Sequence, residues 1–538
     1  MTEFYIRTED IKDEDVLKLF VETTLDRRIV SALKGRNPTI LLGSRGVGKS
    51  LLLRVAQAEL LRDFDGDRVF PVYVSFTKSS LIQTSSPEAF HHWMMARICA
   101  AITRALAKRG LLAPAPTSLK VLSGDNAPDA LAKTAIEVIA EQFESVWKTP
   151  DLQVNTSTLP IVDDFKDALE DICQELKISR IALFVDEAAH IFLPEQQRQF
   201  FTLFRDLRSP YLTCNAAVYP GVTSFGSTFQ LVHDATVLSV DRDVTNANYV
   251  KNMREIVERQ ADSATTKNME TNGQNFAALA YAATGNPRIL LKTLARAPKL
   301  NSSQLNEVLR EYYRVDVWSE HTLLAGKYEG HRSLIDWGRT FIETTVLPDL
   351  KHKNDAYLSS DKKTSCFFWL HRDVPKAVEQ AMRVLAYTGI VVEHAQGIKA
   401  TRSEIGTRYL VNLGCLFALE GQAAAAVGFQ ISKNLTIKRM SEYGANHDAF
   451  KALSTITASL DDSSVSHQAL RQQLLQGIEV LDLTDWQREK LAELGLLTVG
   501  AVLNASETEL KQAYYVGDVR SRRMRNAAVA SVFEYLSG

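Results

Sequence analysis

Short apolar runs alternate with amphipathic stretches over the N-terminal part of the chain. The runs are rich in β-branched residues and lie at 39–42, 69–74, 181–185, 213–219 and 236–240. Two of the stretches between them, 87–109 and 163–176, carry apolar residues at helical spacing. A continuous apolar run is typical of a strand that is buried on both faces, as in a parallel sheet. The pattern therefore predicts an α/β fold, a parallel sheet with helices on both faces, with ligands bound at the carboxyl ends of the strands.

A glycine-rich loop follows the first of these runs. It comprises Gly43, Ser44, Arg45, Gly46, Val47, Gly48, Lys49 and Ser50, and an apolar helical pattern begins at Leu51. The backbone N–H groups of such a loop can surround phosphate oxygens, and the N-terminus of the following helix adds positive potential. Lys49 would then reach the β- and γ-phosphates, and the Ser50 hydroxyl would ligate Mg²⁺. A turn that merely joins a strand to a helix is the alternative, but the order of strand, loop and helix favours a P-loop site for ATP and Mg²⁺.

Two carboxylates follow the apolar run at 181–185. A P-loop ATPase needs an acidic residue at the end of a neighbouring strand to hold the Mg²⁺ water shell, and Asp186 has this position. Glu187 comes directly after it and would polarise an attacking water as general base. An ordinary acidic helix start after a buried strand is the alternative. Together with the glycine loop, the pair predicts slow, regulatory hydrolysis of ATP to ADP and phosphate, with Lys49 and Glu187 as catalytic residues.

A Gly-Asn-Pro turn at 285–287 precedes Arg288 in a helical part of the chain. An arginine at a helix start can clamp a γ-phosphate, although in isolation a solvated arginine at a helix–helix turn would be the preferred explanation. Combined with 43–50 and 184–187, the turn resembles the second sensor of the AAA+ and STAND ATPases, and the order of motifs resembles their origin-recognition-complex-like (ORC-like) branch. The resemblance spans about residues 1–420. It implies a helical lid whose angle to the sheet domain changes with ATP binding and hydrolysis, with Arg288 as the lid arginine and a third catalytic residue.

The resemblance does not identify the first sensor or an arginine finger. Three polar residues near the end of the run 213–219 are candidates for the first sensor: Asn215, Tyr219 and Thr223. No Arg or Lys lies in 220–235, where many AAA+ proteins carry an arginine finger, and this favours a switch over a ring-type ATPase. Arg205 and Arg208, on the preceding helical pattern, are candidate substitutes. The segment 5–34 is helical in pattern, and the resemblance implies that it packs near the adenine.

The region 329–420 carries helical patterns followed by two short apolar runs. Thr388-Gly389 would end the last helix, and strands are expected at 390–392 and 397–400 with a turn at Gln396-Gly397. Helices followed by a β-hairpin describe a winged helix, which resembles the DNA-binding domain of the ORC-like family. Two basic residues would lie on its wing: Lys399 and Arg402. Because winged helices also serve as protein contacts, DNA binding and protein docking stay equally open here.

The C-terminal region 481–538 repeats a helix–hairpin–helix plan. Gly495 and Gly517 stand in the two expected hairpins. The plan resembles a tandem helix-hairpin-helix domain, similar to the C-terminal domain of the bacterial RNA polymerase α subunit, and this implies backbone contacts to the phosphates of double-stranded DNA. Four arginines follow the second hairpin and would add positive charge: Arg520, Arg522, Arg523 and Arg525. The region has seven basic and eight acidic residues, however, so a helical protein-docking module is the alternative.

These patterns predict five regions along the chain. They are a P-loop ATPase core (1–242), an α-helical lid (243–328), a winged-helix domain (329–420), a linker or helical region (421–480) and an all-α helix-hairpin-helix domain (481–538). The fourth is expected to be a linker because 421–428 is alanine-rich and 454–467 carries clusters of Ser, Thr and Asp.

Composition narrows the class of protein without deciding its function. Apolar residues make up 45%, and the net charge of −2 argues neither for nor against a nucleic-acid partner. The five cysteines are far apart and form no CxxC pair, which predicts small buried residues rather than a zinc site or disulfides. No run approaches the length of a membrane span, and Glu9, Asp10 and Asp13 stand where a secretory signal would be basic and apolar. We therefore expect a cytoplasmic protein without a membrane partner.

The combined expectation is an ATP-binding and hydrolysing switch that acts on DNA or a DNA-associated partner, in replication, transposition or bacterial antiphage defence. The alternative is a STAND-type signalling scaffold that oligomerises and recruits an effector without binding DNA. In either case the effector would be a separate protein, because the chain shows no nuclease, protease or deaminase motif. A helicase or motor is a weaker option, since further motor motifs and a clear arginine finger are missing from the sequence.

Overall fold

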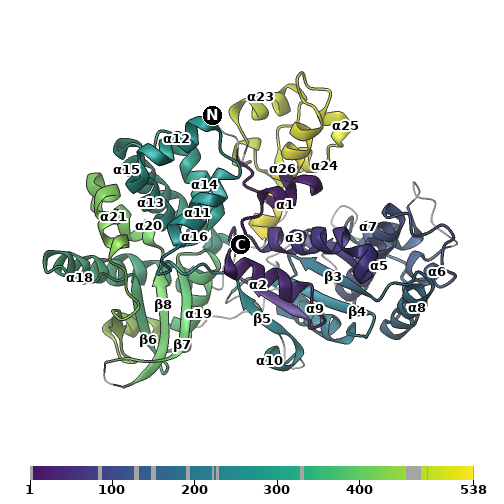
Figure 1. Cartoon of the computed structure of the whole chain (residues 1–538), viewed down its shortest axis with the longest axis horizontal. Coiled ribbons are helices and arrows are strands. Elements are labelled where there is room, and N and C mark those ends of the chain that lie inside the picture. Colours follow the sequence, from purple (N-terminus) through teal and green to yellow (C-terminus); the bar gives the residue numbers. More distant parts are fainter. Residues whose placement is uncertain are drawn as a thin grey trace.

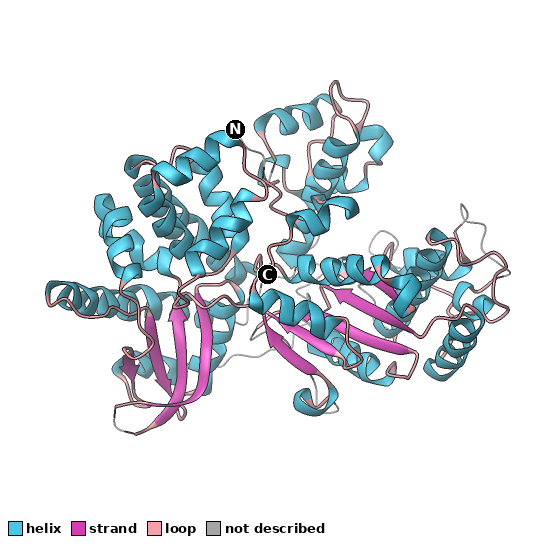
Figure 2. Ribbon diagram, viewed as in Figure 1, coloured by secondary structure: helices cyan, strands magenta, loops and turns pink. Residues whose placement is uncertain are grey.

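Five parallel strands form the sheet of the N-terminal domain (Figures 1 and 2). They are β1 (Thr39–Leu42), β2 (Val69–Ser75), β3 (Arg180–Asp186), β4 (Leu212–Val218) and β5 (Thr236–Ser239). Their order is β2-β3-β4-β1-β5, and all neighbours pair in parallel. The computed structural model describes residues 4–82, 88–125, 133–146, 153–188, 194–220, 223, 225, 229–327, 332–401, 403–455, 474–481 and 483–536. The five expected strands and the parallel α/β fold are thus confirmed.

Side chains of this sheet alternate between two apolar cores. On β4, Cys214, Ala216 and Val218 face one core, and Ala217 faces the other. The helices α2 (Thr24–Leu33) and α3 (Lys49–Arg62) cover one face, and α5 (Ala89–Lys108), α7 (Ala135–Phe143), α8 (Val162–Glu175) and α9 (Pro194–Asp206) cover the other. All five cysteines of the chain are buried and free, as expected. Because both faces are covered, the loops at the strand ends are where polar groups can gather.

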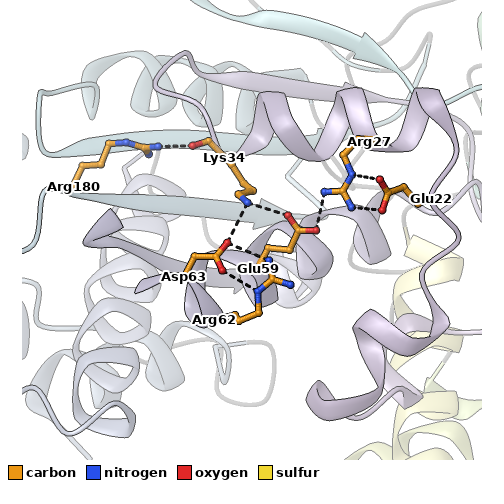
Figure 3. Close-up of polar contacts among 7 residues, drawn as sticks. All are labelled: Glu22, Arg27, Lys34, Glu59, Arg62, Asp63 and Arg180. Atoms are coloured by element: carbon orange, nitrogen blue, oxygen red, sulfur yellow. Dashed lines mark hydrogen bonds and ion pairs between the residues drawn. The ribbon is translucent and has the colours of Figure 1, made fainter. Parts of the chain in front are cut away.

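A network of ion pairs fastens α2 to α3 (Figure 3). The buried Glu59 of α3 accepts hydrogen bonds from Arg27 Nη1 at 2.8 Å and from Lys34 Nζ at 3.0 Å. Arg180, the first residue of β3, donates to the carbonyl of Lys34 and ties the same corner to the sheet. Burial alone would raise the pKa of Glu59, but the hydrogen bonds from Arg27 and Lys34 hold it below its ordinary value. The network thereby fixes the helix that begins at Lys49.

A helical lid follows the sheet and continues into a second helical group. The lid consists of α11 (Tyr249–Glu258), α12 (Ser263–Thr271), α13 (Gly273–Ala282), α14 (Pro287–Arg296) and α15 (Ser302–Glu311). The second group consists of α16 (Val317–Lys327), α17 (Arg332–Phe341), α18 (Leu347–Ser359) and α19 (Lys376–Tyr387). One apolar core runs through both groups, from Val244 to Leu453. The expected domain boundary at residue 328 is therefore not a break in packing.

The part of the chain from 332 to 455, here called the downstream module, carries a four-stranded sheet in the order β7-β8-β6-β9 (Figure 2). Its strands are β6 (Phe367–His371), β7 (Val391–Lys399), β8 (Ile405–Val411) and β9 (Ser441–Tyr443). The expectation of two strands joined by a turn at Gln396-Gly397 is wrong, because β7 runs through this position and pairs with β8. Gly397 has a φ of +68° and lies in a register shift of β7, so the glycine permits a bulge. The chain reverses after Lys399 instead.

The downstream module also extends beyond its expected end at residue 420. The helices α20 (Leu413–Phe417) and α21 (Ala424–Lys433) belong to the shared core, and β9 adds a strand beside β6. The region expected to be a linker or helical is therefore packed and largely helical from 421 to 455. Its alanines, Ala424 and Ala425 among them, are buried as small residues of the core. Residues 456–473 lie outside the described part of the chain.

One segment, Leu413–Lys433, is long and apolar enough to cross a membrane by length and composition. Half of it is buried within the protein. Its helix is also interrupted at Gly421, where the backbone leaves the helical region (φ 56°, ψ −117°). Burial and interruption together indicate a core segment of the downstream module.

The C-terminal domain has a small core of its own and stands beside the N-terminal domain (Figure 1). It contains η9 (Ile478–Val480), α23 (Asp485–Glu493), α24 (Val499–Asn504), α25 (Glu507–Leu510) and α26 (Asp518–Leu536). α26 packs against η1 (Thr8–Asp10) and η3 (Thr77–Leu81), and Leu81 joins the core of the C-terminal domain. The domain is thus attached to two segments of the N-terminal domain.

Candidate nucleotide-binding site

The glycine loop lies between β1 and α3, where Lys49 is the first helical residue. Lys49 Nζ donates hydrogen bonds to the carbonyls of Gly43 at 2.6 Å and Ser44 at 3.0 Å. Burial lowers the pKa of Lys49 to about 8, and the charges of Glu187 and Asp186 oppose this shift. A triphosphate would offer the ammonium charged oxygens in place of neutral carbonyls, which favours the protonated lysine. The loop and its lysine therefore suit an anionic ligand.

Asp186, the last residue of β3, lies buried beside the start of α3. The Tyr73 hydroxyl donates to its Oδ2 at 2.5 Å, and a second hydrogen bond joins it to Ser50. Burial and the charge of Glu187 nevertheless raise the pKa of Asp186. In the described residues, no group of three or more His, Cys, Asp or Glu side chains could hold a metal. Ser50 and Asp186 fit Mg²⁺, which proteins often bind through one or two carboxylates with phosphates and water completing its shell.

Glu187 follows with a left-handed backbone, at a φ of +57°. Its carboxylate accepts the hydrogen bond of the Tyr219 hydroxyl, with distances of 2.9 Å to Oε2 and 3.1 Å to Oε1. Burial, followed by the charge of Glu187, raises the pKa of Tyr219 well above its ordinary value, so the phenol stays a donor. Lys49 Nζ lies 4.1 Å from the centroid of the same ring. Tyr219 therefore touches both the lysine of the loop and the candidate base.

Tyr219 is the first-sensor candidate that contacts Glu187. Asn215 accepts a hydrogen bond from the Thr39 backbone and donates to the Leu33 carbonyl, so it holds β4 and β1 together. Thr223 donates its hydroxyl hydrogen to the carbonyl of Tyr219. The sequence could not separate the three, since all are polar residues near the end of one strand.

The Gly-Asn-Pro turn of the lid rests on the glycine loop. Asn286 Nδ2 donates to the Arg45 carbonyl at 2.6 Å, and the Arg288 backbone N–H donates to the Gly46 carbonyl at 3.4 Å. Arg288 Nε donates to the carbonyl of Ile6 at 3.3 Å. Residue 46 has to be glycine here, because its φ is +83° and a Cβ atom would lie 2.7 Å from Arg288 Cβ. The predicted lid arginine and the loop are thus in direct contact.

Arg242 belongs to the site, although it was not predicted from the sequence. Its Nη1 donates to the Val47 carbonyl at 2.8 Å, and its Nη2 lies 3.4 Å from Asp26 Oδ1. Its Nε is buried and has no hydrogen-bond partner among the described residues. Such an orphaned donor beside the loop suits an acceptor supplied by a ligand. Its place just after the run 236–240 is the signal that could have revealed it, because parallel strands end at one edge of the sheet.

A cavity of about 360 Å³ connects these groups. Its polar lining includes Lys49, Ser50, Glu187, Tyr219, Arg242 and Arg288. Its apolar lining includes Leu19, Phe20 and Val21 of the N-terminal segment with Ile256 and Leu291 of the lid. The volume is within the range of roughly 300–1,000 Å³ that is usual for small-molecule sites. Arg205 and Arg208 are not among the residues that line it, and Arg205 donates to Asp206 instead.

The residues predicted to contact DNA lie in the C-terminal domain and do not line this cavity: Gly495, Gly517, Arg520, Arg522, Arg523 and Arg525. The Arg520 guanidinium lies over the Trp486 ring, 4.8 Å from its centroid. Arg525 Nη1 lies 3.9 Å from a carboxylate oxygen of Glu507. Arg520 and Arg525 are therefore also engaged within the domain.

Some predicted contact residues are described only in part. The side chain of Arg522 lies outside the described part of the chain, as does Arg402, expected on the wing. Lys399, the other residue expected there, is the exposed last residue of β7. The sequence interpretation of these positions stays a prediction.

Sequence similarity to known proteins lies in the N-terminal part of the chain. The ORC-CDC6-like family model matches residues 4–108, a stretch that contains the glycine loop. A search among curated proteins finds no match.

Solved structures with a similar arrangement share little sequence with this chain. ORC1 of Aeropyrum pernix, in complex with DNA, is 14% identical over 78% of this chain and 95% of that chain, with a TM-score of 0.30. ORC2 of the same organism, in ADPNP–ADP complexes, is 10% identical over 78% and 93%, with a TM-score of 0.32. AMPPCP-bound DnaA of Aquifex aeolicus is 13% identical over 64% and 86%, with a TM-score of 0.26.

The family match covers the loop that holds Lys49 and Ser50. The parallel sheet brings Asp186 and Glu187 to the same edge. An ORC-CDC6-like region, residues 4–108, thus lies within a parallel α/β domain that has the glycine loop and the strand-end carboxylates of a P-loop site.

Proposed function

We propose that this chain is a switch that binds and slowly hydrolyses MgATP and acts on double-stranded DNA or a DNA-associated partner. The observation that carries the proposal is the convergence of five residues from distant segments at one cavity and its wall: Lys49, Ser50, Asp186, Glu187 and Arg288. A lysine, a hydroxyl, two carboxylates and an arginine are the groups that phosphoryl transfer from ATP requires.

The residues of the chain have separable tasks in this reaction. Lys49 exchanges two loop carbonyls for phosphate oxygens, and the orphaned Nε of Arg242 offers a further donor. Ser50 and Asp186 would hold Mg²⁺, which would neutralise charge on the phosphates. Glu187 accepts a proton from the attacking water.

The lid gives the switch its moving part. Its turn contacts the glycine loop through Asn286 and Arg288. A ligand bound at the loop therefore changes how the lid packs against it. The lid and the downstream module share one core. Because close-packed cores resist deformation, the two move together as a rigid body. We infer that nucleotide exchange and hydrolysis move both together.

The C-terminal domain is connected to the nucleotide cavity through two other segments. Thr8 of η1 and Thr77 of η3 line the cavity, and α26 packs against both of these short helices. A nucleotide therefore touches the two segments to which the proposed DNA-binding domain is attached. We propose that ATP alters how this domain is presented to DNA.

Duplex binding over a salt series, with and without ATP, tests the DNA part of the proposal. The test variant replaces Arg520, Arg522 and Arg523 by alanine. The matched control removes three exposed lysines of the lid region instead: Lys251, Lys267 and Lys299. Each lost phosphate contact should reduce the log–log salt slope by about 0.9, so the arginine variant should bind weakly with a shallow slope while the control binds like the wild type.

Other outcomes would redirect the proposal. Absence of duplex binding at low salt, together with ATP-dependent growth in mass by light scattering, would favour a STAND-type scaffold that recruits an effector. For hydrolysis, Glu187→Gln should bind ATP and retain it unhydrolysed. Undiminished turnover in this variant would remove Glu187 from its role as base.

A further inference from the structure

Tyr219 links the candidate base to the downstream module. Its ring meets the ring of Tyr387 edge-on, with centroids 5.4 Å apart and an angle of 68° between the planes. Tyr387 is the last residue of α19 and is only 2% exposed. Leu324 of α16 and Ile335 of α17 belong to the same apolar cluster. A residue of the downstream module thus lies one side chain away from Glu187.

The end of α19 also approaches the glycine loop. A Cβ atom on Gly389 would lie 3.9 Å from Ser44 Oγ. The intervening Thr388 has its hydroxyl 3.2 Å from Nδ1 of the buried His321 on α16. Because α19 belongs to the shared core, a displacement of the downstream module from the sheet domain would carry Tyr387 away from Tyr219.

The Tyr219 hydroxyl occupies a hydrogen-bonding position on Glu187 that a base-activated water could also use. It is 2.9 Å and 3.1 Å from the two oxygens of Glu187, within the distance at which a general base contacts its water. A hydrogen bond to a carboxylate also stabilises the charged form and so weakens the group as a base. The observed contact therefore restrains Glu187.

We propose that Tyr387 is a positioning residue for ATP hydrolysis: it holds the Tyr219 ring in place, so that the Tyr219 hydroxyl restrains Glu187 until the downstream module moves away. The inference rests on the proposed hydrolysis of ATP. It makes the downstream module a regulator of turnover, and a partner that displaces this module would accelerate hydrolysis.

Steady-state ATPase kinetics of the full chain test the proposal with two releasing variants. Tyr219→Phe removes the hydroxyl, and Tyr387→Ala removes the supporting ring. Each should raise kcat about tenfold, the effect of losing one hydrogen bond to a charged group, and leave KM within about twofold. Tyr387→Phe keeps the ring and should have the wild-type kcat. Tyr443→Ala, which truncates another buried tyrosine of the module, should also leave kcat unchanged.

The same two substitutions in the Glu187→Gln variant separate a restraint on Glu187 from general damage to the fold. In Glu187→Gln, neither releasing substitution should change turnover, because no base remains to be freed. An unchanged or lower kcat in Tyr219→Phe with normal ATP affinity would overturn the inference, as would an equal rise in Tyr443→Ala. If no variant hydrolyses ATP although all bind it, the restraint is refuted. If no variant binds ATP, the proposed function itself fails.

Discussion

Asn286 and Asn301 cap neighbouring lid helices in the same way, but Asn286 also contacts the glycine loop. Each precedes a ten-residue helix and accepts a hydrogen bond from the third helical residue, from Ile289 N at 3.2 Å and from Gln304 N at 2.9 Å. Asn286 additionally donates from Nδ2 to the Arg45 carbonyl at 2.6 Å. A comparison of Asn286→Ala with Asn301→Ala therefore separates the loss of a cap from the loss of a lid–loop contact.

These contacts set the expected differences between the two variants in the free energy of unfolding and in ATP affinity. Loss of an asparagine cap costs about 1 kcal/mol, so Asn301→Ala should lower the free energy of unfolding by that amount. Asn286→Ala also removes a hydrogen bond of a side chain that is 6% exposed, which adds about 1 kcal/mol. Removal of this contact weakens ATP binding only to the extent that ATP tightens it, so a contact worth about 1 kcal/mol sets an upper limit of roughly fivefold weaker binding in Asn286→Ala.

Titration with a fluorescent ATP analogue measures the affinity, and thermal unfolding with and without ATP measures the stability. Asn301→Ala should bind ATP like the wild type and show the full stabilisation by ATP. Asn286→Ala should bind more weakly and show a smaller stabilisation. If the two variants had the same ATP affinity, the lid–loop contact would have no part in nucleotide binding, and our account of the lid would be wrong.

Three further predictions concern single side chains. Lys49→Ala should abolish ATP binding, because the ammonium is the charged group at the centre of the glycine loop, where the phosphates would bind; calorimetric titration with unchanged affinity would contradict this. Arg288→Ala should bind ATP yet lose ATP-dependent compaction in small-angle X-ray scattering, and normal compaction would remove Arg288 from the lid mechanism. Because the pKa of Glu59 is lowered in the folded protein, its ion pairs stabilise the fold at neutral pH, and this contribution is lost as the pH falls below about 4.5 and through the folded-state pKa. Glu59→Gln should be about 2 kcal/mol less stable at pH 7 and show a flatter acid profile in chemical unfolding, whereas parallel profiles for the two proteins would argue against the network.

Local patterns were sufficient to predict the sheet domain. The run 39–42 and the loop 43–50 carry their own signals, since a strand needs apolar residues and a phosphate loop needs closely spaced glycines. Asp186 and Glu187 could be placed beside them because parallel strands end at one edge.

Positions that depend on distant partners could not be predicted in this way. Gly397 was expected in a turn, but pairing of β7 with β8 makes it part of a bulge within one strand. The alanine-rich stretch 421–428 was expected to be a linker or a helical region, and only the tertiary structure shows that its alanines are buried in the core shared by the lid and the downstream module. Neither position could be resolved from the sequence, because turn formation and burial depend on what packs against a segment.

The sequence alone thus determined the phosphate loop, the strand-end carboxylates and the fold that joins them, because backbone geometry and hydrophobic periodicity are encoded over short stretches. Only the tertiary structure decided that Tyr219 is the polar residue on Glu187, that Arg242 enters the cavity, and that Tyr387 reaches this site from the downstream module. These residues are far apart in the chain, and the packing of separate apolar cores brings them together.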